Sequence, residues 1–152
     1  MKYLYEELIN FDVDVKNAEE AILYNSNLLY EKGFVDEGYA QKVIDREKDF
    51  PTGLISTGRG IAIPHTNTVL VKKPALCILI PNNLLKFKMM GTTDEWIEVS
   101  IVIQILIKDS KEQMSMLKKL MTLMKKPELL DQIYYCKNKS SIAEMLRFVE
   151  EE

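Results

Sequence analysis

The sequence contains a single histidine, His65, among its 152 residues. A zinc site built from several histidines is therefore excluded. A mixed site would need His65 to converge with Cys77 and Cys136, and nothing in their spacing suggests this. The two cysteines form no CxxC pair, so reduced thiols in a cytoplasm are the expected state. We expect no metal and no cofactor.

Long apolar runs and an excess of positive charge are also absent. The longest unbroken apolar run is Ala75–Ile80, far short of the roughly 18 residues that cross a bilayer. Residues 1–7 lack the apolar stretch of a secretory signal. The 20 Lys and Arg against 23 Asp and Glu give a net charge of −3, which disfavours a nucleic-acid binder with a large basic patch.

What is present is the composition of a globular domain. Hydrophobic residues make up 47% of the chain, which excludes disorder as its main state and is enough for a real core. The length is that of about one domain, and no repeat, low-complexity tract or linker divides it. We therefore expect a single domain over residues 1–152.

Apolar spacing predicts helices at both ends of the chain and strands between them. In the first half, Asp14 or Asn17 can cap the first helix, Gly33 follows its last turn, Asp36 can cap the second, and Pro51 ends it. The two predicted ranges are 15–30 and 37–48. Residues rich in Gly, Ser and Thr then form a loop over 51–60, and the predicted strands are 60–63, 75–80, 84–89 and 97–107.

The last of these strands is apolar on both faces, which is typical of a central strand covered on both sides. A helix capped by Asp109 or Ser110 is then expected through about residue 125, Pro127 opens another, and Ser140 or Ser141 caps the last. In the helix that ends near residue 125, the side chains expected to face the core are Leu117, Leu120, Met121 and Met124, and Met114 is also assigned to core packing. Helices flanking a block of strands predict an α/β sandwich.

The segment Gly60–Thr66 carries the strongest chemical signal. Its strand ends in Pro64, whose φ is fixed, and His65 follows on this stiff backbone. The preceding loop supplies glycines, backbone N–H groups and the Ser56 and Thr57 hydroxyls, which can surround an anion. A neutral imidazole can attack phosphorus and form a covalent intermediate, and with an ordinary pKa of ~6.5 most of it is neutral at pH 7. A single histidine is otherwise most often a surface or core residue, and the loop lacks the P-loop and GxGxxG patterns.

Two segments together favour a catalytic role for His65 over a structural one. Residues 46–53, REKDFPTG, and residues 60–65, GIAIPH, strongly resemble the enzyme IIA domains of the bacterial sugar phosphotransferase system, fructose/mannitol class (type 2). The resemblance extends over nearly the whole chain. It implies a mixed sheet of about five strands with helices on both faces. It also implies that His65 is the catalytic residue, accepting a phosphoryl group from HPr and passing it to a cysteine of a IIB component.

The resemblance also implies residues that stabilise the phosphoryl group. Arg46 matches the arginine near the phosphohistidine, although a charge at a helix end is the ordinary interpretation of such a residue. Thr52 is a further candidate through its hydroxyl group, and Thr66 through its side chain or its backbone. Many relatives carry a second histidine where this chain has Gln113, and galactitol-type IIA proteins are similar in having Gln there. A polar residue heading an inward helix stripe is either an edge of the core or a site residue, and we expect Gln113 to reach the His65 ring directly or through one water.

The resemblance implies a phosphocarrier for galactitol or a related sugar, cytoplasmic and linked to the membrane only through a IIC component. No nucleic-acid partner is expected. Two alternatives remain open from the sequence. A regulatory IIA-like domain would signal its phosphorylation state to a protein partner, and a non-catalytic binding module would hold His65 for structural reasons.

Overall fold

The structure is a computed structural model that describes residues 2–151. Its centre is a six-stranded mixed sheet with the order β1-β4-β6-β3-β2, and β5 pairs with β6 beside this path. The strands are β1 (Ile9–Val13), β2 (Gly53–Leu54), β3 (Gly60–Ala62), β4 (Ala75–Pro81), β5 (Leu85–Lys88) and β6 (Trp96–Leu106). β6 runs parallel to β3 and antiparallel to β4 and β5.

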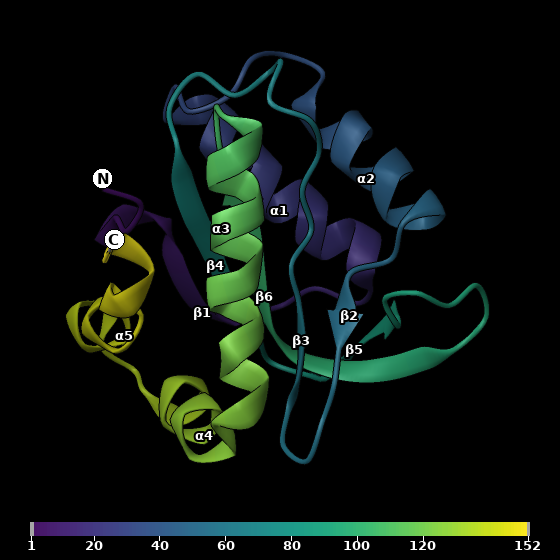
Figure 1. The fold of residues 1–152 in the computed structure, drawn as a ribbon, viewed down its shortest axis with the longest axis vertical. Coiled ribbons are helices and arrows are strands. Elements are labelled where there is room, and N and C mark those ends of the chain that lie inside the picture. The colour runs from purple at the N-terminus through teal and green to yellow at the C-terminus, as the bar shows by residue number, and fades with distance from the viewer. Residues whose placement is uncertain (1, 152) are drawn as a thin grey trace.

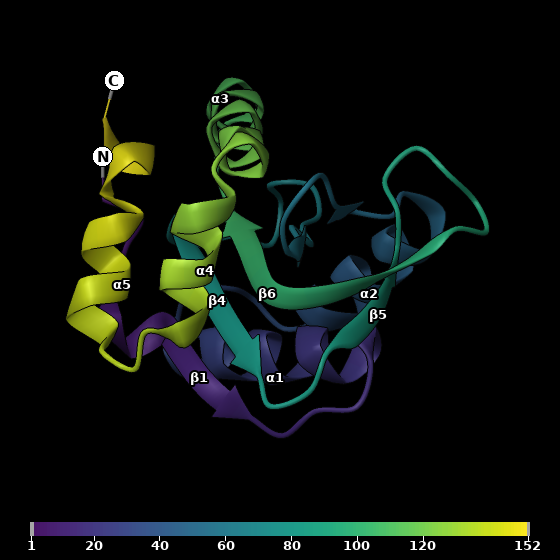
Figure 2. The same cartoon turned by 90° about the horizontal axis from the view of Figure 1, so that it is seen from below.

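Helices cover both faces of this sheet (Figures 1 and 2), as predicted. Helices α1 and α2 pack on one face, and α3, α4 and α5 lie on the other. The helices are α1 (Ala18–Glu31), α2 (Tyr39–Asp49), α3 (Ser110–Met121), α4 (Pro127–Tyr135) and α5 (Lys139–Met145), with short 3-10 turns η1 (Glu6–Leu8), η2 (Thr122–Lys125) and η3 (Arg147–Glu150). The α/β sandwich is confirmed, with six strands where about five were expected.

The β6 strand is central, as its sequence predicts. Every residue from 99 to 106 is buried. Ile101, Ile103 and Ile105 join the apolar cluster beneath α3, α4 and α5, whereas Val102 joins a cluster on the opposite face. Because successive side chains of a strand point to opposite faces, apolar residues at consecutive positions fill both layers at once.

Two of the predicted helix caps are wrong. α2 begins at Tyr39 after Gly38, whose φ of +88° lies in the left-handed region that glycine tolerates, so Asp36 lies outside the helix. α5 is capped by Asn138, whose side chain accepts from the Ser141 N–H, rather than by Ser140 or Ser141. The alternatives Asn17 and Asp109 are confirmed as caps of α1 and α3.

The inward face of α3 differs in part from the predicted stripe. Leu120 is fully buried and Leu117 and Met124 pack against the core, but Met121 and Met114 are 44% and 57% exposed. Met121 follows Leu120 by about 100° around the helix, which turns it away from the sheet. Core packing is therefore wrong for these two methionines, and the buried one on this helix is Met116.

Candidate functional site

His65 follows β3 and the rigid Pro64. The Pro64 carbonyl accepts a hydrogen bond from the Ile105 N–H on β6, at 3.0 Å. At the start of β3, a Cβ atom on Gly60 would collide with the Glu98 carbonyl oxygen, so only glycine allows β3 to lie this close to β6. The sheet therefore fixes the backbone at both ends of the segment that carries His65.

The His65 ring is held in one tautomer. Its Nδ1 lies 2.8 Å from the Ile63 carbonyl oxygen, and a carbonyl can only accept, so Nδ1 carries the hydrogen. In the neutral ring the free lone pair is then on Nε2. Burial and the nearby charge of Arg46 lower the pKa of His65, against the opposing effect of the Ile63 bond. The ring is consequently neutral and nucleophilic at pH 7.

Arg46 comes from the last turns of α2 and lies close enough to His65 for its charge to act on the imidazole. Its guanidinium stands 5.0 Å from the centre of the Phe50 ring. Its Nε is buried and has no hydrogen-bond partner within residues 2–151. A buried charged donor without an acceptor is costly, and a bound anion is the kind of partner that would satisfy it.

Thr52 occupies a supporting position between α2 and β3. Its hydroxyl donates to Glu47 Oε1 at 2.7 Å and accepts from the Ile63 N–H at 3.2 Å. Its backbone N–H donates to Glu47 Oε2 at 2.8 Å. In this structure the one hydroxyl hydrogen of Thr52 is therefore given to Glu47.

Glu47 was not singled out as a site residue from the sequence, although it stands next to Arg46 in the REKDFPTG segment. Burial raises the pKa of its carboxyl group to about 7, against the opposing effect of the two Thr52 hydrogen bonds. The only signal in the sequence is its place in that segment, because an acidic residue near a helix end is common and does not by itself indicate a site.

Thr66 directly follows His65, and Gln113 lies in α3, the helix after β6. Thr66 is 7% exposed. Gln113 is half-buried in the first turn of α3, where its N–H donates to the Asp109 carbonyl. This turn follows the end of β6, close to the point where Ile105 bonds Pro64. A direct contact between the Gln113 side chain and the imidazole stays a prediction.

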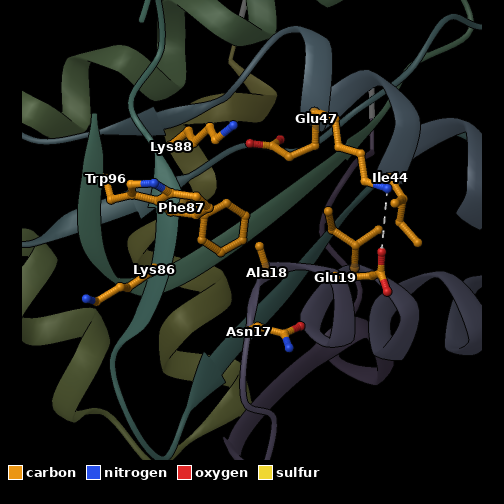
Figure 3. Close-up of a pocket in the computed structure, with 11 residues that line it drawn as sticks. Asn17, Ala18, Glu19, Ile44, Glu47, Lys86, Phe87, Lys88 and Trp96 are labelled. Carbon is orange, nitrogen blue, oxygen red and sulfur yellow. Dashed lines mark ion pairs between the residues drawn. The ribbon is translucent and has the colours of Figure 1, made fainter. Parts of the chain in front are cut away.

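A cavity of about 390 Å³ is lined in part by Glu47 (Figure 3). It lies between α1, α2 and β5, and Glu47 and Lys88 face each other across it. Trp96, 57% exposed, forms part of its rim. The lining residues include Glu47 but not His65.

Within residues 2–151, no group of three or more His, Cys, Asp and Glu side chains is placed to hold a metal ion. Both cysteines are free thiols, Cys77 buried and Cys136 partly so. No helix in this described range combines the length and apolar character needed to cross a membrane.

Known proteins resemble this chain in sequence and in fold. A family model described as the phosphoenolpyruvate-dependent sugar phosphotransferase system, EIIA 2, matches residues 2–148. The galactitol-specific EIIA component of Escherichia coli (strain K12) is 29% identical over 115 residues, 76% of each chain.

Two solved structures share the fold. A complex of enzyme IIAMTL with phosphorylated enzyme IIBMTL from Escherichia coli matches with a TM-score of 0.75 at 22% identity, over 97% of this chain and 98% of that one. The nitrogen regulatory protein IIA-Ntr from Neisseria meningitidis matches with a TM-score of 0.78 at 20% identity, over 94% and 95%. With a family model that spans nearly all of its length, the chain belongs to the type 2 EIIA family of the phosphoenolpyruvate-dependent sugar phosphotransferase system.

Proposed function

We propose that this protein is a phosphocarrier in which His65 accepts a phosphoryl group from phospho-HPr and passes it to a IIB component. The observation that carries the proposal is a neutral, tautomer-fixed imidazole near a buried guanidinium donor that has no acceptor among residues 2–151. The first is a nucleophile, and the second is suited to the negative charge that the nucleophile would receive.

The chemistry requires only a nucleophile and charge stabilisation. The Nε2 lone pair attacks phosphorus, the bond between phosphorus and the HPr donor breaks, and its electron pair leaves with HPr. The phosphorylated ring keeps its hydrogen on Nδ1 and gains positive charge, which the Ile63 carbonyl stabilises. In the second transfer step a cysteine of the IIB component attacks phosphorus. The bond between phosphorus and Nε2 breaks, and its electron pair stays on Nε2.

The phosphoryl group brings up to two negative charges to a chain whose net charge is already −3. We assign their stabilisation to Arg46 first, through its unpartnered Nε, and then to Thr66 and Gln113. Thr52 acts indirectly because Glu47 takes its hydroxyl hydrogen.

Galactitol or a related sugar is the proposed substrate of the complete system. The galactitol-specific relative supports this, as does Gln113 in the place of a second histidine. The IIA–IIB complex among the fold relatives supports a IIB component as acceptor. The proposed location is the cytoplasm, with contact to the membrane only through a IIC component.

The test is reconstitution with phosphoenolpyruvate, enzyme I and HPr, followed by addition of a galactitol-type IIB protein. We expect one phosphoryl group per chain, transfer of that group to IIB, and no labelling of the variant His65→Ala. Labelling without transfer to any IIB protein would favour the regulatory alternative. A failure of phospho-HPr to label the folded wild type would favour the binding module and contradict the proposal.

A further inference from the structure

The carboxyl group of Glu47 joins the end of α2 to the loop before β3. One of its oxygens accepts the Thr52 hydroxyl hydrogen at 2.7 Å, and the other accepts the Thr52 N–H at 2.8 Å. A carboxylate that accepts at both oxygens fixes the side chain and the backbone of Thr52 together. The direction of the Thr52 hydroxyl is therefore set by Glu47.

The Thr52 hydroxyl passes this constraint to the histidine loop. With its hydrogen on Glu47, its lone pairs are free to accept the Ile63 N–H at 3.2 Å, which the Thr52 carbonyl shares more weakly at 3.4 Å. Ile63 is also the residue whose carbonyl accepts from His65 Nδ1 at 2.8 Å. The two polar groups of Ile63 thus link Thr52 on one side to the imidazole on the other.

We propose that Glu47 is a positioning residue for His65: acting through Thr52, it orients the Ile63 backbone and so keeps the imidazole hydrogen on Nδ1 and the lone pair on Nε2. Glu47 does not touch the ring itself. The proposal deepens the phosphocarrier function, on which its kinetic part rests. Its structural part concerns the unphosphorylated protein alone.

The protonation state of Glu47 decides whether this chain of bonds is complete. The ionised carboxylate accepts at both oxygens, whereas the protonated acid carries a hydrogen that competes with the Thr52 hydroxyl. Burial raises the pKa of Glu47 to about 7. The native state therefore holds a proton that the unfolded chain loses above an ordinary pKa of about 4.5, and stability falls as pH rises from about 4.5 to about 7. An ionised Glu47 thus costs stability, which favours a role in function.

Other charges surround this carboxyl group from each packed element. Its own helix contributes Arg46 and Lys48, and Lys48 is engaged with Glu19 of α1 at 4.0 Å. Lys88 faces Glu47 across the cavity in Figure 3, and Lys86 lies further along the same strand. None of these lysines lies within ion-pair distance of Glu47 in the described part of the chain. In the described part of the chain, Thr52 is thus the residue that forms direct hydrogen bonds with the Glu47 carboxyl group.

The first test is the tautomer of His65, read by nitrogen NMR of protein labelled with 15N-histidine. Because the chain has one histidine, a single imidazole contributes to the spectrum. In the wild type at pH 8 we expect the hydrogen on Nδ1. In Glu47→Gln and Thr52→Val the population with the hydrogen on Nε2 should rise severalfold. Thr52→Ser keeps the hydroxyl and should restore the wild-type spectrum.

Asp49→Asn is the matched control, since it removes one negative charge from an exposed position on the same helix. Its spectrum should equal that of the wild type. A folded Glu47→Gln protein with the wild-type tautomer would overturn the proposal. If Glu47→Gln does not fold, the same outcome in Thr52→Val overturns it. No phosphoryl donor is used, so this result is independent of the proposed function.

The second test compares phosphoryl transfer from HPr in the wild type and Glu47→Gln. Glutamine resembles the protonated acid at every pH because it cannot ionise. At pH 8 the wild-type rate should therefore be roughly three- to tenfold higher than the Glu47→Gln rate, which corresponds to about one hydrogen bond. That ratio should fall towards one as pH is lowered through about 7. A ratio independent of pH contradicts the proposal, whereas absence of transfer in both proteins contradicts the phosphocarrier function instead.

Discussion

Two of the regions in which this molecule buries polar side chains differ in their chemistry. At the end of β3, His65 is accompanied by Arg46, whose buried Nε has no partner among the described residues. In the middle of β6, Gln104 donates to Ser26 at 2.9 Å and to Tyr39 at 3.5 Å, and its Oε1 has no partner in the same range. We call the second region the Gln104 cluster, consisting of Gln104, Ser26 and Tyr39.

The difference lies in what can change charge near neutral pH. At the first region the pKa of Glu47 is raised to about 7 and that of His65 is lowered from its ordinary value. In the Gln104 cluster burial raises the pKa of Tyr39, and burial likewise raises the pKa of Cys77 beside it, so both groups stay uncharged near neutral pH. A buried polar atom without a partner is thus not a site by itself. It becomes one where titratable groups and a nucleophile stand beside it.

The change with the largest expected effect is His65→Ala. It removes the only imidazole, so phosphorylation by phospho-HPr should be lost completely. The fold should be retained, because the Pro64 bond to Ile105 involves backbone only. Phosphate incorporation and circular dichroism check the two parts. Full labelling of this variant would remove the distinction between the two regions.

Arg46→Ala should have the next largest effect. Loss of a hydrogen bond between charged groups corresponds to roughly ten- to hundredfold slower transfer. The pKa of His65 should rise, because the Arg46 charge is one of the causes that lower it. Stopped-flow transfer and NMR titration of His65 measure the two effects. An unchanged rate together with an unchanged His65 pKa would return Arg46 to the status of an ordinary helix-end charge.

Gln113→Leu and Gln104→Leu make the same chemical change in the two regions. We expect Gln113→Leu to slow transfer roughly three- to tenfold, the loss of about one hydrogen bond to the phosphoryl group. Its free energy of unfolding should change by no more than about 0.5 kcal/mol, because Gln113 is only half-buried. Wild-type transfer by the folded variant would contradict the predicted reach of Gln113 to His65.

Gln104→Leu should have the smallest effect on transfer, namely none. It leaves the Ser26 and Tyr39 hydroxyls without their partner, so the free energy of unfolding should fall by about 1–3 kcal/mol. Urea unfolding monitored by Trp96 fluorescence measures this loss. Slower transfer at a temperature where the variant is fully folded would show that the Gln104 cluster is coupled to the histidine site.

Much of the fold was accessible from the sequence because long elements have clear periods. β6 is apolar on both faces and was placed to within one residue at each end. Short strands were not accessible: β1 carries the polar residues Asn10 and Asp12, and β2 has only two residues. Both are held by pairing with β4 and β3, which is a tertiary effect that local sequence does not encode.

The site was accessible in one part and hidden in another. His65 followed from being the only histidine, at the end of a strand that closes with proline. Glu47 was hidden because its importance arises from burial and from contacts with Thr52, five residues away along the chain. The Thr52 hydroxyl donates to Glu47 in this structure, and its contact with a phosphoryl group stays a prediction.

The most direct test of the central claim is the phosphorus–nitrogen coupling in 15N-histidine-labelled protein phosphorylated through HPr. Because the Ile63 carbonyl holds the hydrogen on Nδ1, we expect one phosphohistidine signal with coupling to Nε2 of His65. Coupling to Nδ1, or phosphate on any residue other than His65, would contradict the claim that this imidazole is held ready for transfer.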